Sequence, residues 1–431
     1  MDKVEGFGEA DAFPSDKAEA RWIWPEFTRP FGFPAGGHPL CQAASDDGNA
    51  STSPPSAWMV SPSRNRTAPI LLQEALDFVQ EPLSSVEVIA PNFKRKLSGV
   101  TSTIIQLIPL QRANGLNIVT MGPGLPAELP SIGWASLPGL WFKPRTRPFR
   151  IWHARRNNEM IAGILMRHVL RMKLRLLFTS AAQRDHQPFT KWLIRRMNGV
   201  IATSGKSGSF LKVPHTVIMH GVDTELFHPP QDDQDRFAAS GLPGEFLVGC
   251  SGRIRPSKGT DLFVDAMINL LPKHPGWTAV MTGRTTAEYK GFEQALRNKI
   301  AKAGLGDRIV FLGEVPDVRL WYRRMTLYVA PSRNEGFGLT PLEAMASQTA
   351  VVASDAGAYA EMIEPETGTV VAAGDGAALE KAIAPYLADP AMCEEAGKLA
   401  LAHVRKNFPL QKEAGRIGEV YEQLFAAGSR P

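Results

Sequence analysis

The chain has 431 residues, more than one hydrophobic core usually holds, so we expect two domains. Its apolar content of 44% is ordinary for a soluble globular protein. The three cysteines are scattered without paired spacing, which excludes a disulfide framework and a zinc motif. No apolar run reaches the roughly 20 residues that a membrane-spanning helix needs. The net charge of +5 is uneven: residues 91–220 carry 20 Lys and Arg against 3 Asp and Glu, which favours an anionic partner such as nucleic acid, a membrane or a phosphorylated acceptor.

Residues 1–80 show no sustained periodicity, and stretches such as GFPAGGHPL are rich in Gly and Pro. We therefore expect a disordered extension of unassigned role, with a short helix over 70–80. The acidic start MDKVEGFGEADAF lacks the apolar core of a secretory signal peptide.

Apolar strands alternate with helical segments from residue 85 onward. Strands are predicted at 85–91, 116–124, 149–154, 174–180, 199–204, 245–252, 277–283, 308–313, 327–332 and 350–355. Helices are predicted at 100–115, 156–171, 188–198, 259–273, 289–304, 318–325, 340–347, 376–390 and 410–427. The turn-rich segment 220–236 interrupts the series.

This alternation predicts an α/β chain with two Rossmann-like, doubly wound parallel-sheet domains. The expected domains cover 81–221 and 222–410, and a C-terminal helix within 411–431 could pack back on the first domain. Ligands of such sheets bind beyond the carboxyl ends of the strands, so we expect the site in a cleft between the two domains.

The stretch SGRIRPSKGTDLF (251–263) joins a predicted strand to a predicted helix. Arg253 and Lys258 lie before the helix N-terminus, where free N–H groups and the helix dipole attract an anion. Each charge-assisted hydrogen bond contributes about 1.5–3 kcal/mol, so both residues together with the backbone could hold a diphosphate without a metal. The alternative is two solvated residues in a surface loop.

The stretch PSRNEGFGLTPLEAMA (331–346) places two glutamates around a Gly-rich loop. Thr340 suits an N-cap and Pro341 the first helical position, so Glu343 could simply complete a capping box. Glu335 precedes the helix and has no such structural role. The loop glycines would let backbone N–H groups approach anionic oxygens while the carboxylates accept from hydroxyls, as a sugar nucleotide requires.

These motifs resemble a known family. The pattern E-GFGLTPL-E is similar to the paired-glutamate motif of retaining, two-domain glycosyltransferases with the GT-B fold (glycosyltransferase family 4, group 1), and GRIRPSKG resembles their Arg/Lys diphosphate site. The segment HGVDTELFHP resembles their interdomain segment. The resemblance covers about 221–360.

The resemblance implies roles for single residues. Arg253 and Lys258 would neutralise the donor diphosphate, Glu343 would accept from the ribose hydroxyls, and Glu335 would hold the transferred sugar. The loop backbone expected at the sugar and phosphate comprises Gly336, Phe337, Gly338, Leu339 and Thr340.

The resemblance extends to the first half of the chain. It implies that Gly99 contacts the donor at a helix N-terminus and that His153 contacts the donor sugar near the reacting carbon, although a lone histidine is often structural. Arg284 could add a phosphate contact.

VIAPNFKRKLSGVTSTIIQLIP, WHARRNNEM and FTSAAQRDH resemble lipopolysaccharide-core mannosyltransferases. The basic segment would then bind a lipid-linked, anionic saccharide acceptor, and the enzyme would be cytoplasmic, in peripheral contact with the inner membrane. The residues expected at the acceptor are Lys94, Arg95, Lys96, Arg155 and Arg156.

Two other patterns are set aside. GVIATSGKS (199–207) has five residues between Gly199 and Gly205, where a P-loop requires four. DQD (233–235) lies in the linker and not at a strand end, so we predict no metal and no other cofactor.

The expected reaction is retaining transfer of a hexosyl group, with mannose from GDP-mannose as the donor that the resemblance favours. The resemblance also implies that the acceptor attacks from the same face and that the leaving phosphate takes its proton. One alternative is a sugar-nucleotide epimerase or hydrolase, which would need a water-activating acid/base set that the sequence does not show. Another is a non-catalytic sugar-nucleotide binder, against which the intact Glu335, Lys258 and Arg253 argue. A nucleic-acid binder lacks a recognition fold in this sequence.

Overall fold

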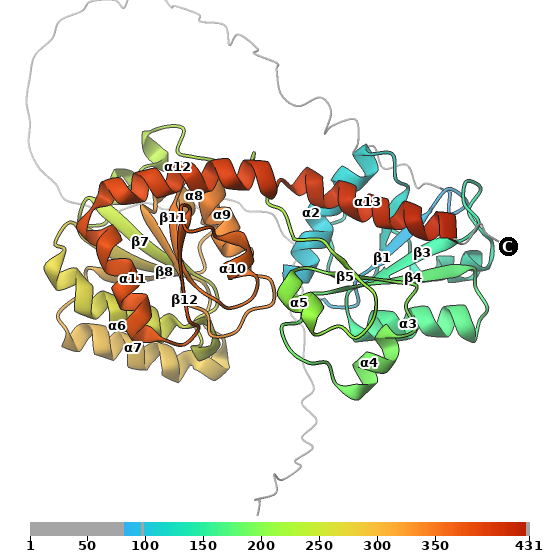
Figure 1. The fold of residues 1–431 in the computed structure, drawn as a ribbon, viewed down its shortest axis with the longest axis horizontal. Coiled ribbons are helices and arrows are strands. Elements are labelled where there is room, and N and C mark those ends of the chain that lie inside the picture. The colour runs from blue at the N-terminus through green and yellow to red at the C-terminus, as the bar shows by residue number, and fades with distance from the viewer. Residues whose placement is uncertain (1–81, 96–98, 428–431) are drawn as a thin grey trace, which may run out of the picture. The chain divides into compact units, whose positions relative to one another are not determined.

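The computed structural model describes residues 82–95 and 99–427 (Figure 1). The predicted extension over 1–80, with its helix at 70–80, lies outside the described residues, and so does Lys96.

The first half of the described chain forms one sheet of six parallel strands in the order β2-β1-β3-β4-β5-β6. Its central strands are buried on both faces, as their continuous apolar runs require. The strands are β1 (Val88–Pro91), β2 (Ile118–Met121), β3 (Arg150–Ala154), β4 (Leu174–Ser180), β5 (Gly199–Ala202) and β6 (Thr216–Val217).

Two pairs of helices cover the faces of this sheet. Helices α2 (Gly99–Ala113) and α13 (Leu410–Ala427) pack on one face, and α3 (Asn157–His168) and α4 (Pro188–Ile194) pack on the other (Figure 1). The short helix α5 (Gly205–Ser209) follows β5, and the 3₁₀ helix η2 (Trp134–Trp141) precedes β3.

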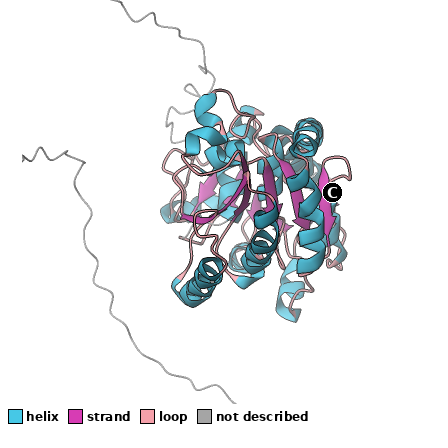
Figure 2. Cartoon of the chain, turned by 90° about the vertical axis from the view of Figure 1, so that its left-hand side faces the viewer, coloured by secondary structure: helices cyan, strands magenta, loops and turns pink. Residues whose placement is uncertain are grey.

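The second half forms another six-stranded parallel sheet, in the order β12-β11-β10-β7-β8-β9. Helices enclose its strands on both sides (Figure 2). The strands are β7 (Phe246–Ser251), β8 (Trp277–Thr282), β9 (Ile309–Gly313), β10 (Leu327–Ala330), β11 (Ala350–Ser354) and β12 (Gly368–Val371).

The helices of the second half also form two layers. One hydrophobic cluster packs α6, α7 and α11 on the sheet, and another packs α8, α9, α10 and α12 on the opposite face. Their bounds are α6 (Thr260–Leu270), α7 (Lys290–Lys302), α8 (Val318–Arg324), α9 (Thr340–Ala346), α10 (Tyr359–Met362), α11 (Gly376–Ala388) and α12 (Pro390–Asn407). Shorter 3₁₀ helices are η3 (Asp233–Asp235), η4 (Phe237–Ser240), η5 (Pro256–Lys258), η6 (Leu271–Lys273) and η7 (Ala287–Tyr289).

The last helix returns to the first sheet. Helix α13 contributes Leu410, Ile417 and Tyr421 to the same buried cluster as β1, β4 and α2. Its Glu413 carboxylate accepts hydrogen bonds from the backbone N–H of Gly221 (2.8 Å) and pairs with His220 Nδ1 (2.6 Å). The C-terminal segment is thereby tied to the start of the segment that connects the two sheets.

The predicted fold class, a pair of doubly wound parallel-sheet units, is confirmed. The domain limits at 81, 221 and 410 stay predictions. The structure adds β6, β12, α5, α10 and α12, which the sequence patterns did not predict. Helix α12 was missed because Asp389–Pro390 looked like the end of α11. Asp389 instead caps the next helix, with Oδ1 accepting from Ala391 N at 3.1 Å.

Among the helices of residues 82–95 and 99–427, none combines the length and apolarity needed to cross a bilayer.

Candidate functional site

Both predicted motifs of the second half follow neighbouring strands. Strand β7 starts this sheet, and the chain adds β8 and β9 on one side of it and β10 to β12 on the other. The change of direction lies between β7 and β10, and the loops at such a point of a parallel sheet diverge to leave room for a ligand. The loop after β7 carries Lys258, and the loop after β10 carries Glu335.

Lys258 and Glu335 form an ion pair although 77 positions separate them. Lys258 Nζ donates to Glu335 Oε2, and the two side chains are only 21% and 18% exposed. The other oxygen of Glu335, Oε1, accepts from the backbone N–H of Gly336 at 3.1 Å. An ammonium and a carboxylate therefore meet in a partly buried position beyond the carboxyl ends of β7 and β10.

Backbone hydrogen bonds tie the two loops together. The N–H groups of Arg333 and Asn334 both donate to Ser257 O, at 3.0 and 3.1 Å. Arg333 also forms a bidentate pair with Asp261 in the first turn of α6, with both distances at 2.7 Å. These contacts fix the position of Glu335 relative to Lys258 before any ligand binds.

Gly338 allows the Gly-rich loop to fold over Glu335. Its φ is +87°, in the left-handed region, and a Cβ there would overlap the Tyr359 ring and lie 2.8 Å from Glu335 Cγ. Only glycine fits without displacing these side chains. Phe337, beside it, is buried and meets His220 edge to face at 4.7 Å between ring centroids.

The predicted capping box at α9 is wrong. The helix begins at Thr340, its N-cap is Leu339, and no side chain caps it. Thr340 and Pro341 are the first two helical positions, so Glu343 lies on the first turn with its carboxylate free of a capping role. Its Oε2 accepts from the hydroxyl of Tyr322 at 2.9 Å.

The surroundings of Glu343 change its ionisation. Burial raises its pKa to about 7, while the hydrogen bond from Tyr322 acts in the opposite direction. A carboxyl group with a raised pKa in the folded state favours the neutral form. Its contribution to stability is complete below the unfolded-state pKa of about 4.3 and is lost as the pH rises through about 7.

We therefore expect the wild-type chain to lose stability between about pH 4 and about pH 7, and Glu343→Gln to lose less. Glutamine keeps an acceptor for Tyr322 but carries no charge, so the difference between the two proteins should grow with pH to the order of 3 kcal/mol. Urea unfolding at several pH values measures it. Asp265→Asn, at an exposed ion pair on α6, is the control. Parallel pH curves for wild type and Glu343→Gln would contradict the expectation.

The other predicted cations of this half are exposed. Arg253 lies directly after β7 with its side chain in solvent. Arg284 is 63% exposed, lies 3.8 Å from Glu314, and borders a cavity of about 200 Å³ that Ile254 also lines. Of the predicted donor-site residues, Lys258 and Glu335 are thus in direct contact. Arg253, in the loop after β7, and Arg284, in the loop after β8, are at the surface.

The first sheet changes direction between β1 and β3. Gly99 is the first residue of α2 in the loop after β1, is exposed, and has open space where a Cβ would be. His153 lies near the end of β3 and is fully buried. The structure thus places both predicted residues at the corresponding point of the first sheet.

His153 is engaged at both ring nitrogens. Nδ1 is 2.7 Å from the Tyr421 hydroxyl on α13, and Nε2 is 2.7 Å from Thr179 Oγ1 on β4. Burial and the nearby Arg155 hold the pKa of His153 well below 6.5, so the ring is neutral at pH 7. A contact with a donor sugar would require Nε2 to exchange its partner Thr179.

We expect Tyr421→Phe to destabilise the protein by about 1–3 kcal/mol, because the change leaves a buried ring nitrogen of His153 without its partner. Urea unfolding at pH 7 measures the loss. Tyr289→Phe removes a hydroxyl from the partly exposed η7 and should have little effect. Equal stability of the two variants would show that the His153–Tyr421 contact adds nothing.

The predicted acceptor residues separate into two groups. Arg156 is 18% exposed and donates to Glu159 Oε1 (2.7 Å) and Asn92 Oδ1 (2.8 Å), so it ties the start of α3 to the loop after β1. Lys94 and Arg95 are exposed in the loop after β1. Arg95 also lines a cavity of about 690 Å³ at the carboxyl ends of β1 and β2, together with Phe93, Gly122, Pro123, Ser131, Ile132, Gly133 and Trp134.

The segment set aside as a P-loop holds a carboxylate of the chain itself. The N–H groups of Gly205 and Lys206 donate to Glu361 at 2.7 and 2.8 Å, and Lys206 Nζ donates to Asp355 O at 2.6 Å. In the other segment set aside, Asp235 pairs with Arg323 at 2.7 Å. Within the described ranges, no three His, Cys, Asp or Glu side chains gather as a metal site would require.

Comparison with known proteins agrees with this geometry. A family model described as glycosyl transferases group 1 matches residues 232–402. The chain is 66% identical over 344 residues to the lipopolysaccharide core biosynthesis mannosyltransferase LpcC of Rhizobium leguminosarum bv. viciae, covering 80% of this chain and 98% of the relative. The chain belongs to the group 1 glycosyltransferases.

Further relatives of this glycosyltransferase support the same family and fold. LpsB of Rhizobium meliloti, a lipopolysaccharide core biosynthesis mannosyltransferase, is 53% identical over 347 residues, which are 80% of this chain and 99% of LpsB. The crystal structure of Anabaena HepE in complex with UDP and glucose has a TM-score of 0.67 at 19% identity, covering 78% of this chain and 100% of HepE. The two parallel sheets of this enzyme are therefore those of the GT-B fold.

Sequence reasoning missed several tyrosines of this glycosyltransferase. Tyr359 directs its hydroxyl toward Glu335 Oε2 at 3.5 Å, Tyr322 binds Glu343, and Tyr421 binds His153. All three are buried, and burial raises their pKa values. In the sequence, each of these tyrosines fits the apolar face of its helix like an ordinary core residue. Only its hydroxyl group could have indicated a polar partner in the core.

Proposed function

We propose that this glycosyltransferase moves a mannosyl group from GDP-mannose to a saccharide of the lipopolysaccharide core, with retention of the anomeric configuration. The single observation that carries the proposal is the Lys258–Glu335 pair at the β7/β10 switch point, in a chain that is 66% identical to a protein named as a core mannosyltransferase. The pair supplies one positive and one negative group for a ligand that has both phosphate and hydroxyl groups.

The donor would bind over the second sheet. Lys258 and Arg253 would neutralise the diphosphate, and the backbone from Gly336 to Thr340 would donate to its oxygens or to the sugar. Glu335 would accept from the hydroxyls of the sugar, and Glu343 from the ribose. Arg284 is proposed as an additional phosphate contact from the surface.

In the reaction, the bond between the anomeric carbon and the diphosphate oxygen would break while a bond to the acceptor oxygen forms on the same face. The acceptor proton would pass to the departing phosphate oxygen. Negative charge grows on the diphosphate, and preorganised cations stabilise that charge more in the transition state than in the ground state. Lys258 is held in place by the loop contacts, so little reorganisation is needed. No metal or other cofactor is proposed.

The first sheet would bind the acceptor. Lys94 and Arg95 are exposed beside the cavity of about 690 Å³, and Phe93 and Trp134 lie 5.3 Å apart, centroid to centroid, at its wall. Aromatic rings offer apolar faces to sugar rings, and the two cations suit an anionic group on the acceptor. His153 and Gly99 are proposed at the donor side of this half. We propose the cytoplasmic face of the inner membrane as the location and no nucleic-acid partner.

Donor binding and transfer test the proposal separately. The purified full chain is first screened by thermal shift with GDP-mannose, GDP, UDP-glucose and UDP-galactose, and GDP-mannose should stabilise it most. It is then incubated with GDP-mannose and lipopolysaccharide from a strain with a truncated core, and the new linkage is assigned by NMR. Release of free mannose without acceptor, transfer from another sugar nucleotide, or an inverted linkage would each contradict the proposal.

A further inference from the structure

Exposed apolar side chains are concentrated in one part of this enzyme. Of the twelve large hydrophobic side chains that are exposed in the described residues, nine lie between Trp134 and Trp192. Single exposed apolar residues are ordinary on a protein surface, but a cluster of them marks a surface that binds something.

Helix α3 carries part of this cluster on its outer side. Ile161, Leu165 and Val169 follow one another at intervals of four residues, so they form one stripe, and they are 44%, 50% and 66% exposed. The opposite side of the helix buries Met160 and Met166 in the core. The helix is apolar on both sides. The inner side packs against the core, whereas contacts within the described chain leave the outer side exposed.

The end of η2 extends this stripe. Trp141 Nε1 donates to Leu170 O at 2.6 Å, which places Trp141 and Phe142 beside the C-terminal end of α3. Phe142 is 77% exposed, the largest value among these apolar residues. We call the following six residues the α3 patch: Trp141, Phe142, Ile161, Leu165, Val169 and Leu170.

Helix α4 lies beside α3 on the same face of the sheet (Figure 1). Asn157 at the start of α3 donates to Thr190 Oγ1 at 2.8 Å, and Arg167 near its end donates to Asn198 just after α4. The outer side of α4 carries Phe189 and Trp192 as an exposed stacked pair with centroids 5.9 Å apart. This pair continues the apolar surface next to α3.

Exposed cations flank the α3 patch along the sequence. Lys143, Arg171 and Lys173 are exposed next to the α3 patch in the sequence. Residues 131–180 contain ten Lys and Arg and a single acid, Glu159, which is buried and paired with Arg156.

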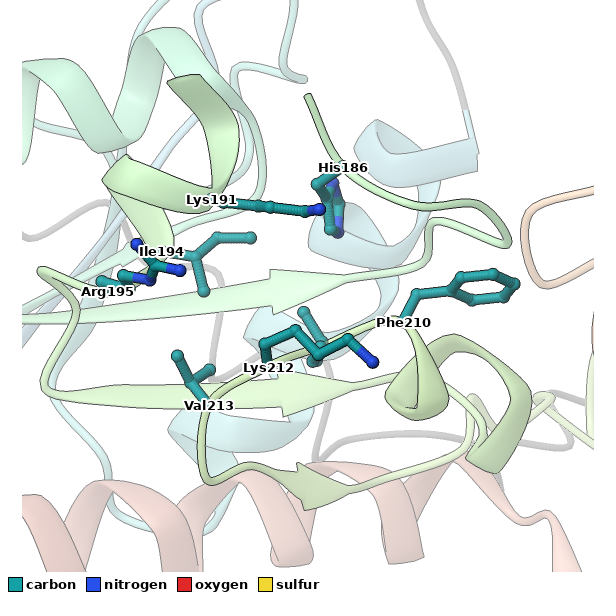
Figure 3. A pocket seen from close by; sticks show the side chains of 8 residues that line it. His186, Lys191, Ile194, Arg195, Phe210, Lys212 and Val213 are labelled. Atoms are coloured by element: carbon teal, nitrogen blue, oxygen red, sulfur yellow. The ribbon is translucent and has the colours of Figure 1, made fainter. Parts of the chain in front are cut away.

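The flank of α4 is basic as well. Figure 3 shows Lys191 on this helix, Arg195 directly after it and Lys212 on a neighbouring loop, around a pocket of about 10 Å³. That volume holds about one water molecule, so these residues do not form a site for an organic ligand. Lys191 pairs with Asp185 at 2.6 Å, so the exposed Arg195 and Lys212 are the cations of this group that add net positive charge beside α4.

We propose that the α3 patch docks this enzyme on an anionic phospholipid bilayer. Aromatic and aliphatic side chains would enter the boundary between headgroups and acyl chains, while Lys143, Arg171 and Lys173 contact lipid phosphates. Charge decides between a bilayer and a second copy of the chain: a symmetric dimer through the patch would bring two basic surfaces together, whereas an anionic bilayer neutralises them. That this docking presents a lipid-linked acceptor rests on the proposed function.

Vesicle co-sedimentation of the full chain tests the proposal. Binding should be strong to phosphatidylcholine vesicles that contain phosphatidylglycerol and weak to phosphatidylcholine alone. Leu165→Glu with Val169→Glu should lower the partition coefficient at least about tenfold, since it places two charges in the apolar boundary. The matched control is Met392→Glu with Leu399→Glu, which changes two similarly exposed apolar residues of α12 and should bind as wild type does.

The electrostatic part has its own variant. Lys143→Gln with Lys173→Gln should reduce binding at low ionic strength and make the remainder less sensitive to salt. If the Glu double variant melts early, Leu165→Gln with Val169→Thr replaces it and should weaken binding in the same direction.

Two results would overturn the docking surface. One is equal vesicle binding by the α3 variants and the α12 control. The other is self-association of wild type that the α3 variants abolish, which would make the patch an interface between copies. Thermal shift by GDP-mannose should be the same in wild type and the α3 variants, so a chain that binds vesicles but no donor would refute the proposed function and leave the docking surface standing.

Discussion

Lys258→Ala should lower kcat/KM for mannosyl transfer about a thousandfold, a loss of about 4 kcal/mol in transition-state stabilisation. In the structure the Lys258 ammonium already lies in a partly buried position against Glu335. As negative charge grows on the departing diphosphate, this ammonium is the described cation best placed and best held to meet it. Arg253 is exposed, so we expect it to replace little of the lost charge.

Steady-state kinetics with GDP-mannose and the truncated-core acceptor measures this loss. Lys299→Ala is a matched control, because Lys299 forms an ion pair with Asp265 at 2.5 Å on the outer surface of the same half and should leave kcat/KM unchanged. Lys258→Arg keeps the positive charge but replaces the compact ammonium with a larger, planar guanidinium, and it should recover part of the rate. Near wild-type kinetics for Lys258→Ala would remove the assigned role in diphosphate stabilisation.

The fold was largely predictable because apolar strands and helices alternate along the whole described chain. Continuous runs such as LRLLFTS are buried on both faces of a parallel sheet, and β4 occupies the predicted 174–180. The strands that were missed, β6 and β12, are short, and one has only two residues. A two-residue strand has no periodicity to detect.

The donor-site motifs were recognisable because their residues are close in sequence to strand ends and helix starts. Their meeting depends on β7 and β10 being neighbours, which a doubly wound sheet provides. The contact of His153 with Tyr421 was not predictable in the same way, since 268 positions separate the two residues. It depends on the packing of α13 against the first sheet, and nothing in either local pattern specifies that packing.

Arg156 and Glu343 show how local patterns can mislead. WHARRN offered two adjacent arginines for an acceptor, yet Arg156 turns inward to Glu159 and Asn92 because a buried carboxylate at the start of α3 needs a cation. Thr340 and Glu343 have capping-box spacing, but the helix starts at Thr340 itself, one residue earlier than that motif requires. A shift of one residue in a helix start thus frees a carboxylate.

Glu335→Gln should lower kcat/KM about a hundredfold or more while it changes the free energy of unfolding by only about 1 kcal/mol. The amide has nearly the same shape, so the loop and its contact with Gly336 should persist. It lacks the negative charge that holds Lys258 and that would accept from the hydroxyls of the donor sugar. Glu394→Gln, at the exposed pair with Lys398 on α12, should change neither kinetics nor stability.

Combining Lys258→Ala with Glu335→Gln shows whether the two groups act as a unit. Because Lys258 Nζ and Glu335 Oε2 are in direct contact, each single change should already disturb the other group. The kcat/KM of the double variant should therefore be close to that of Lys258→Ala, the less active of the two single variants. Losses that multiply would mean that Lys258 and Glu335 act independently, on separate parts of the donor. Non-additive losses would mean that the positive charge for the phosphate and the acceptor for the sugar depend on one shared contact.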